Sequence, residues 1–372
     1  MKEPIAIIGG GIAGLSLSID LRRRGHAVTV LEKGHYPRHK VCGEYISMES
    51  HRYLMDICPS LSTLSLPKIT QFKLTAPGGN QFTTALGLGG FGISRYKLEE
   101  MLFNEALKQG VVCMTGTKVQ EVLPDADSNG YRIQTSQGFV TASFVCNSSG
   151  RQSNVSQRTV LPDKSDTNYI GVKYHVKLKR DAGQIEIHNF PGGYCGISAI
   201  EEDKACLCYI VNSQKLHLAG NAIPELERRF LFQNAHLKNL LTNAEFVFKE
   251  PVTVSGIHFR IHAPETADAF YLGDSAGSIA PITGNGMSMG LRSASVLASH
   301  MDRYFAQTIT LDQLHVSYAH FWTDNFAFRI KRSRHLQKLA ESPFLTRCLI
   351  NMFNICPPMA RGIIKQTHGN PF

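Results

Sequence analysis

The feature that most constrains the fold is the glycine pattern Gly9-x-Gly11-x-x-Gly14, which lies between two apolar segments. The run Ile5–Ile8 before it has the character of a buried parallel strand. A helical apolar pattern follows the glycines, and a second apolar strand ends in Glu32. This order of strand, turn, helix and strand predicts a Rossmann-like α/β domain that binds a dinucleotide.

Each residue of the pattern has a physical task at such a site. Gly9 permits the tight turn, Gly11 lets a pyrophosphate approach the backbone, and Gly14 lets the helix pack closely on the strand. The N-terminus of the helix offers unpaired N–H groups and the positive end of its dipole to the phosphates. Glu32 is placed to accept a hydrogen bond from a ribose 2′-hydroxyl, and its charge disfavours the 2′-phosphate of NADP.

A second glycine cluster, Gly273-Asp274-Ser275-Ala276-Gly277, has two interpretations. It fits the G-x-S-x-G turn that presents a hydrolase nucleophile, and it fits a cofactor loop in which Asp274 is the working residue. A hydrolase helix would start at Ser275, and Pro281 would then lie in its second turn at a cost of about 3 kcal/mol. We therefore expect the helix to begin near Gly284-Asn285-Gly286, and we favour the cofactor loop.

With these motifs and the mid-chain segment around Gly150 and Ser153, the chain resembles the FAD-dependent oxidoreductases of the glutathione-reductase-type fold. More narrowly, it is similar to p-hydroxybenzoate hydroxylase-like aromatic monooxygenases and to geranylgeranyl reductases. The resemblance implies that Asp274 binds the ribityl chain of FAD and that residues 284–287 present backbone N–H groups to the flavin ring. The cofactor-binding residues predicted from the pattern and the resemblance are Gly9, Gly11, Ala13, Gly14, Glu32, Lys33, Arg38, Cys42, Gly43, Arg95, Val119, Gly150, Gly273, Asp274, Pro281, Gly284, Asn285, Gly286 and Met287.

Cys42 has two open interpretations. It is one of nine cysteines, and the ordinary role of such a residue is that of a small buried hydrophobic side chain. The pair Cys42-Gly43 also matches the cysteine near the flavin in the reductase subfamily, which makes Cys42 the candidate catalytic residue. Arg38 and Arg95 match arginines that reach the cofactor in relatives, and the alternative for both is a solvated surface position.

Residues 156–260 change to an alternating pattern of apolar and polar side chains. This pattern predicts an antiparallel sheet with one solvent-exposed face, and the resemblance makes it the substrate domain. Tyr194 and Cys195 occupy the stretch where geranylgeranyl reductases have their substrate motif, so both are predicted pocket residues. The predicted domains are a cofactor domain of residues 1–68, 87–155 and 261–310, a substrate domain of residues 69–86 and 156–260, and a helical C-terminal region of residues 311–372.

The chain is basic, with 39 Lys and Arg against 30 Asp and Glu and a net charge of +9. No nucleic-acid-binding motif accompanies this charge, so no nucleic-acid partner is predicted. The basic segment 329–338 is predicted as a solvated helix face, with peripheral membrane contact as the alternative. Nine scattered cysteines favour a reducing cytoplasm over a disulfide framework. Cys206 and Cys208 lack a second ligand pair, so no metal is predicted.

The sequence therefore predicts an FAD-dependent oxidoreductase that is reduced by NAD(P)H and has no separate nicotinamide domain. Hydroxylation of an apolar or aromatic small molecule with O₂ is ranked first, because a generic apolar pocket suffices while flavin carries the chemistry. Reduction of a carbon–carbon double bond is the alternative, and a non-catalytic flavin-binding module is the third. The W-x-W motif of flavin halogenases is absent, since Trp322 is the only tryptophan. The substrate and the oligomeric state are left open.

Overall fold

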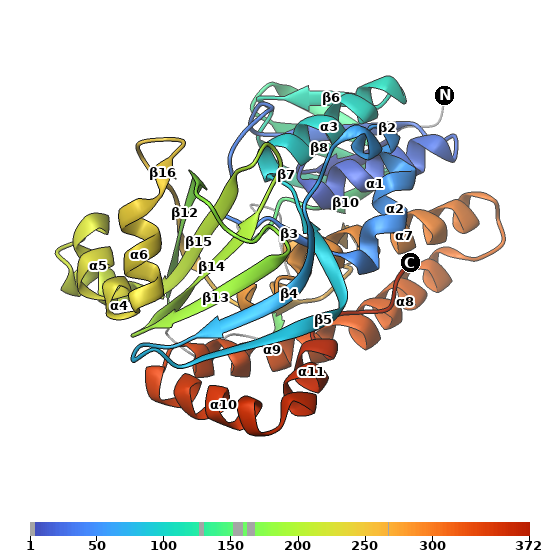
Figure 1. The fold of residues 1–372 in the computed structure, drawn as a ribbon. Coiled ribbons are helices and arrows are strands. Elements are labelled where there is room, and N and C mark those ends of the chain that lie inside the picture. Colours follow the sequence, from blue (N-terminus) through green and yellow to red (C-terminus); the bar gives the residue numbers. More distant parts are fainter. Residues whose placement is uncertain (1–3, 126–129, 152–158, 162–167, 267) are drawn as a thin grey trace.

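The glycine-rich N-terminal segment lies at the centre of a five-stranded parallel sheet (Figure 1). The computed structural model describes residues 4–125, 130–151, 159–161, 168–266 and 268–372. The strands follow the order β19-β10-β1-β2-β6, and every neighbouring pair is parallel. The predicted Rossmann-like arrangement is therefore confirmed. The strands are β1 (Ile5–Ile8), β2 (Val28–Glu32), β6 (Val112–Thr115), β10 (Phe144–Asn147) and β19 (Phe270–Tyr271).

Three helices pack in this part of the molecule, and α1 contacts the other two. They are α1 (Ile12–Arg23), α3 (Arg95–Lys108) and α7 (Gly286–Phe305). Helix α1 ends where Gly25 adopts a φ of 90°, a left-handed conformation that costs glycine little. Ser94 caps α3, since its Oγ accepts a hydrogen bond from the N–H of Lys97 at 3.0 Å. Helix α7 begins at Gly286, after Pro281, as the sequence predicts.

The second sheet has nine strands and contains most of the alternating segments. Its order is β16-β12-β15-β14-β13-β4-β5-β3, with β17 also paired to β12, and only the β13–β4 pair is parallel. Its strands are β3 (Tyr45–Ser47), β4 (Lys68–Thr75), β5 (Gln81–Gly92), β12 (Tyr169–Lys177), β13 (Gln184–Phe190), β14 (Gly193–Ala199), β15 (Ala205–Asn212), β16 (Glu245–Phe246) and β17 (Val252–Ile257).

The prediction of one solvent-exposed face on this sheet is wrong. Helices α4 (Ser213–Leu218), α5 (Ile223–Arg229) and α6 (Ala235–Asn243) pack near one face, where Val172, Tyr174 and Val176 of β12 join an apolar cluster. The alternate positions of β12 carry Lys173 and His175, which are also buried. These polar side chains face the loop before β3 and bond to it. The polar residues that alternate with apolar ones along β12 therefore make contacts inside the protein and do not form a solvent-exposed face.

The domain boundaries predicted from sequence differ in part from the pairing of the strands. Strand β3 and the end of β5 pair in the nine-stranded sheet, whereas the predicted ranges place both in the cofactor domain. The predicted boundary at 155–156 and Ser153 lie outside the described residues. The remaining elements are β7 (Val119–Pro124), β8 (Tyr131–Thr135) and β9 (Gly138–Ala142), the pair β11 (Thr159–Leu161) and β18 (Ile261–His262), helix α2 (His51–Ile57), and the short 3₁₀ turns η1 (Met48–Ser50), η2 (Pro59–Thr63), η3 (Leu231–Gln233), η4 (Gly273–Ser275) and η5 (Pro281–Thr283).

The C-terminal region is helical, as predicted. It comprises α8 (Leu311–Trp322), the π-helical turn η6 (Thr323–Ala327), α9 (Phe328–Ala340), α10 (Pro343–Ile355) and α11 (Pro357–Lys365). Helices α10 and α11 pack against β5, and α10 also contacts β13, so these helices lie beneath the large sheet in Figure 1. Among the described helices, none is both long enough and apolar enough to cross a bilayer.

Candidate functional site

A cavity of about 910 Å³ connects the two sheets and the C-terminal helices. Its wall contains the first turns of α1 and α7, the loop of residues 38–44, the inner face of the nine-stranded sheet, and parts of α9, α10 and α11. The cavity is polar near α1 and becomes apolar toward α10. It therefore has room for a large ligand with one charged end.

The polar end is built on the glycine turn before α1. Gly11 precedes α1 without any side-chain cap, so the N–H groups of the first turn are open to a ligand. Glu32 at the end of β2 accepts hydrogen bonds from Gly10 N (2.7 Å) and Gly34 N (2.8 Å), and from Arg38. Burial opposes ionisation of this carboxyl group, but the bond and charge of Arg38 prevail and lower the pKa of Glu32 to about 2. Glu32 is thus a fixed anion beside an uncapped helix end.

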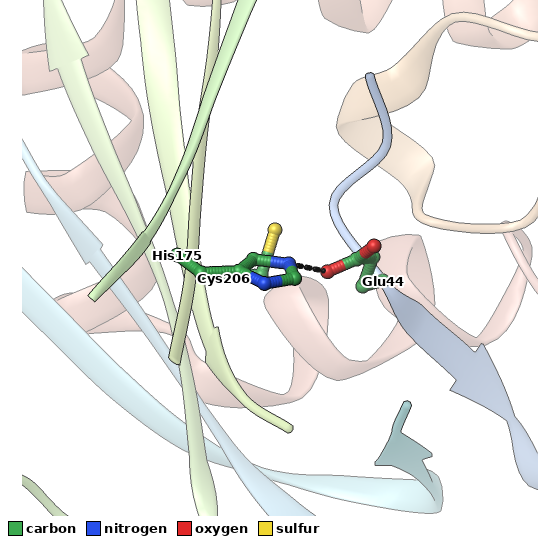
Figure 2. Close-up of side chains that lie close together, drawn as sticks. All are labelled: Glu44, His175 and Cys206. Carbon is green, nitrogen blue, oxygen red and sulfur yellow. Dashed lines mark hydrogen bonds and ion pairs between the residues drawn. The ribbon is translucent and has the colours of Figure 1, made fainter. Parts of the chain in front are cut away.

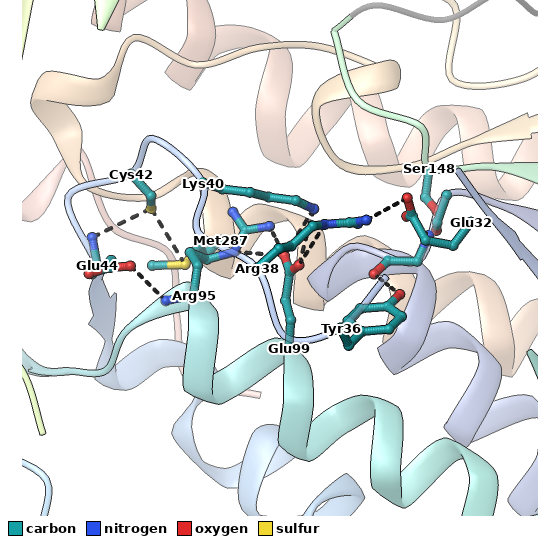
Figure 3. Close-up of polar contacts among 12 residues, drawn as sticks. Glu32, Tyr36, Arg38, Lys40, Cys42, Glu44, Arg95, Glu99, Ser148 and Met287 are labelled. Atoms are coloured by element: carbon teal, nitrogen blue, oxygen red, sulfur yellow. Dashed lines mark hydrogen bonds and ion pairs between the residues drawn. The ribbon is translucent and has the colours of Figure 1, made fainter. Parts of the chain in front are cut away.

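Three cations surround one buried carboxylate next to that turn (Figure 3). Glu99 of α3 is bonded by Arg95 and lies 3.1 Å from Lys40 Nζ and 3.9 Å from Arg38 Nε. A Cβ placed on Gly11 would be 3.6 Å from Lys40 Nζ and 3.8 Å from Arg95 Nη2. The excess positive charge therefore adjoins the open N–H groups of α1, an arrangement suited to a diphosphate.

The second glycine segment forms the opposite wall. Gly284 adopts a φ of 67°, and Asn285 precedes α7 without a side-chain cap, so a second set of helix N–H groups opens into the same cavity. Asn285 Oδ1 is buried and makes no hydrogen bond. Asp274 pairs with Arg151 at 3.1 Å. Ser275 is buried and its Oγ donates to backbone carbonyls, including that of Leu272 at 2.7 Å, which excludes it as an accessible nucleophile.

The comparisons with known proteins agree with this geometry. Residues 4–41 match the family model described as FAD dependent oxidoreductase. Conditioned medium factor receptor 1 of Dictyostelium discoideum is 22% identical over 359 residues, which cover 88% of this chain and 69% of that protein. Among solved structures, the flavin-dependent brominase Bmp2 superposes with a TM-score of 0.79 at 16% identity, covering 99% of this chain and 93% of that one. PqsL, a probable FAD-dependent monooxygenase from Pseudomonas aeruginosa, superposes with a TM-score of 0.70 at 15% identity, covering 94% and 100%.

The fold is shared with Bmp2 and PqsL. The segment that matches the family model contains the glycine turn, Glu32 and Arg38. The residues present fit FAD. Two uncapped helix N-termini face one cavity, the cations lie beside the first of them, and the unpaired oxygen of Asn285 lies beside the second. Lys40, Arg38 and Arg95 would hold the pyrophosphate, and the first turn of α7 would hold the flavin ring.

We expect Lys40 to make the binding of FAD sensitive to pH. Burial lowers the pKa of its ammonium group to about 8, with the charge of Glu99 opposing this shift and those of Arg95 and Arg38 adding to it. A pyrophosphate favours the protonated lysine, so above pH 8 binding must take up a proton. We expect the affinity of the cofactor-free protein for FAD, followed by flavin fluorescence, to fall about tenfold as Lys40 loses its proton. Lys40→Arg keeps its charge and should give a flat profile, so parallel profiles for the two proteins would contradict this role.

Cys42 lies on the wall of this cavity, beside the start of α7. Its Sγ is 3.8 Å from Met287 Sδ and accepts the N–H of Glu44 at 3.4 Å. The Cys42 carbonyl accepts the thiol of Cys206 at 3.1 Å, and Ser198 Oγ donates to the next carbonyl at 2.9 Å. Strands β14 and β15 thereby fix the backbone that presents Cys42.

Glu44 is the centre of a buried cluster just behind this loop (Figure 2). Its carboxylate pairs with Lys173, lies 2.6 Å from His175 Nε2, and accepts the N–H of Arg95 at 2.7 Å. Burial opposes its ionisation, but the hydrogen bond from His175 and the charge of Lys173 outweigh burial and lower the pKa of Glu44. Sequence reasoning missed this cluster, since a positive φ of 56° at Glu44 and distant partners leave no local pattern.

The same cluster offers three ligand atoms to a metal ion, from Glu44, His175 and Cys206, within 4.8 Å of one another. Two observations argue against a metal there. The ammonium of Lys173 is bonded to the same carboxylate and would repel a cation. Burial raises the pKa of the Cys206 thiol well above its usual value, and that thiol already donates a hydrogen bond to Cys42. The cluster therefore supports the loop and is not assigned as a metal centre.

The far end of the cavity is apolar. Tyr194 of β14 lies there, and its hydroxyl group is buried without a hydrogen-bond partner. Cys195, the next residue, points to the opposite face of the sheet and packs in the cluster under α4–α6, because successive strand residues alternate. The prediction that Cys195 lines the pocket is therefore wrong. Apolar side chains of this end come from β4, β13, β15 and the C-terminal helices: Phe72, Leu74, Ile185, Ile187, Ile210, Leu339, Leu349, Phe353, Ile363 and Ile364.

Two further predicted residues lie away from the cavity. Gly14 faces the carbonyl of Gly9, where it sets the contact between helix and turn. Val119 of β7 is buried in the same hydrophobic core as the residues of the five-stranded parallel sheet. The other predicted residues line the cavity: Gly9, Gly11, Ala13, Glu32, Lys33, Arg38, Cys42, Gly43, Arg95, Gly150, Gly273, Asp274, Pro281, Gly284, Asn285, Gly286, Met287 and Tyr194. Glu99 was missed, although its spacing of four from Arg95 on α3 is a local sign of an ion pair.

Proposed function

We propose that this protein is a flavin-dependent monooxygenase that takes electrons from NAD(P)H and hydroxylates an apolar, aromatic small molecule with O₂. The main support for this proposal is that an apolar compartment adjoins the first turn of α7 within the same cavity. A substrate held there by Phe72, Ile187 and Phe353 would contact the flavin edge of the site. The likeness in fold to a probable FAD-dependent monooxygenase supports this choice.

The side chains of the site have defined tasks in this reaction. Bound FAD supplies hydride acceptance and the reaction with O₂, which side chains do not perform. The N–H groups and dipole of α7 stabilise negative charge on the ring edge. The apolar walls exclude water from the reacting atoms. The unpaired hydroxyl of Tyr194 is available to orient one polar group of a bound substrate, since leaving it buried and unbonded is costly.

One observation favours a second candidate, a flavin-dependent reductase of carbon–carbon double bonds. The Cys42 thiol lies on the cavity wall, with its Sγ 3.8 Å from Met287 Sδ at the start of α7. A thiol at this position could deliver the proton that accompanies hydride addition to a double bond. A hydroxylation reaction needs no such donor, so Cys42 separates the two candidates.

Isotope labelling distinguishes these functions. The FAD-loaded protein would be incubated with NADH or NADPH under ¹⁸O₂, with alkylphenols and polyprenyl alcohols as substrates, and the products analysed by mass spectrometry. We expect one ¹⁸O atom in the product of a phenol. A product that gains two hydrogens under anaerobic conditions would instead establish the reductase.

Cys42→Ser provides the matched test of the thiol. If the protein is a monooxygenase, we expect bound FAD and product formation to change by less than about threefold, because serine preserves the loop bonds made by the backbone of residue 42. A fall in kcat of about a hundredfold with FAD retained would identify Cys42 as a proton donor and would favour the reductase.

A further inference from the structure

We propose that the outer faces of α10 and α11 form a docking surface for an anionic membrane. We call this surface the C-terminal face. It carries large apolar side chains that point to solvent, above all Ile355, which is 85% exposed, and Phe344, which is 64% exposed. Leu345 of α10 and Met359 of α11 are exposed as well. On a helix in water the outward side is normally polar, so this face lacks the partner that its composition requires.

The stripe on α10 follows helical spacing. Phe344, Cys348 and Ile355 are exposed, while Thr346, Ile350 and Phe353 are buried on the other side. The inward residues include lining of the cavity, among them Leu349 and Phe353. Helix α10 therefore presents apolar side chains both to the substrate compartment and to the outside. It separates the two by the thickness of one helix.

Charge identifies the occupant of the C-terminal face. Residues 342–372 contain no Asp or Glu, and the exposed cations Arg347, Arg361 and Lys365 stand among the apolar side chains. Helix α9 adds the exposed Lys331, Arg332 and Lys338. Exposed apolar side chains among cations are the composition of helices that lie on anionic lipid. A second copy of this chain would instead bring like charges together across a symmetric contact.

The basic segment 329–338 alone does not form this surface. Its side chains at Ile330, Ser333 and Gln337 are buried, and the exposed large apolar side chains of the C-terminal face lie on the following helices α10 and α11. We therefore assign the proposed membrane contact to α10 and α11 and not to the basic segment 329–338 of α9. The inference does not rest on the proposed function, because docking requires neither electron transfer nor a substrate.

Vesicle binding tests the inference with the full-length, FAD-loaded protein. We expect co-sedimentation with vesicles of phosphatidylcholine containing about one third phosphatidylglycerol, weak binding to phosphatidylcholine alone, and loss of binding at high salt. The double variant Phe344→Ser, Ile355→Ser should bind the anionic vesicles at least about tenfold more weakly. Phe139→Ser is the control, since Phe139 is 55% exposed on β9, far along the chain from α10.

Each outcome decides the inference. Equal binding of the double variant and the wild type, or binding unaffected by the anionic lipid, would overturn it. A dimer in light scattering that the double variant abolishes, without vesicle binding, would assign the face to a second copy instead. FAD content and reduction by NADH, measured without vesicles, should be unchanged in the double variant because neither residue lines the cavity.

Discussion

Gly14→Ala is expected to yield a protein that purifies without flavin and has lost about 3 kcal/mol of unfolding free energy. A Cβ at this position would lie 2.1 Å from the carbonyl oxygen of Gly9 and 2.3 Å from Ser148 Oγ. Both atoms lie just after the ends of β1 and β10, and they are held in place because Ser148 Oγ donates a hydrogen bond to the Gly9 carbonyl at 2.6 Å. Helix α1 must move away, and overpacking of this kind costs roughly 1–3 kcal/mol or more.

The measurement is urea unfolding together with visible absorbance of the purified protein. Gly362→Ala is the matched control, because a Cβ there meets nothing within 4 Å and the residue lies inside α11. We expect this control to remain yellow and to gain up to about 1 kcal/mol from the better helix propensity of alanine. A yellow Gly14→Ala protein with an unchanged unfolding midpoint would show that the helix is not held as closely as described.

Glu44→Gln is the second large effect, with an expected loss of about 3–5 kcal/mol of unfolding free energy. The substitution keeps the shape of the side chain but removes the carboxylate charge that pairs with the fully buried Lys173. Breaking one half of a buried ion pair costs this much because the remaining charge stays desolvated. The loop of residues 38–44 loses its anchor at the same time, so FAD affinity should fall as well.

The double variant Glu44→Gln, Lys173→Met separates the charge from the packing. Removing both charges should restore most of the stability that the single variant loses, and a double-mutant cycle measures the coupling. The pKa of Glu44 is lowered by folding, so its contribution is fully present above the unfolded value of about 4.3 and disappears as the pH falls through the folded value. A wild-type advantage that shrank between pH 7 and pH 5 would contradict this assignment.

Local patterns in the sequence predicted the elements that form the candidate nucleotide site. The strand, glycine turn and helix of residues 5–23 are specified by short-range constraints, and so is the start of α7 after Pro281. Each of these depends on the backbone needs of glycine and proline, which act within a few residues. Apart from Gly14, the predicted site residues on these segments accordingly line one cavity.

The parts that sequence did not reveal depend on contacts between distant segments. Lys173 and His175 follow the alternation of a strand with a wet face, yet they are buried because the loop containing Glu44 covers them. The distinction between Tyr194 and Cys195 depends on which face of the sheet meets the cavity, and neighbouring residues cannot decide that. Tertiary packing sets both outcomes, as it often does for strands.

The bonds between the Cys42 loop and the nine-stranded sheet limit how the pocket can be re-engineered. Ser198 of β14 lines the cavity and also donates a hydrogen bond to that loop, while Lys173 of β12 and Cys206 of β15 bond to the loop from behind it. Altering them to accept a new compound would disturb the grip on the nucleotide. Substitutions intended to widen or reshape the cavity are better placed on β13 and α10, at Ile185, Ile187 or Leu349. These side chains line the cavity and are apolar, so they make no hydrogen bond to the loop.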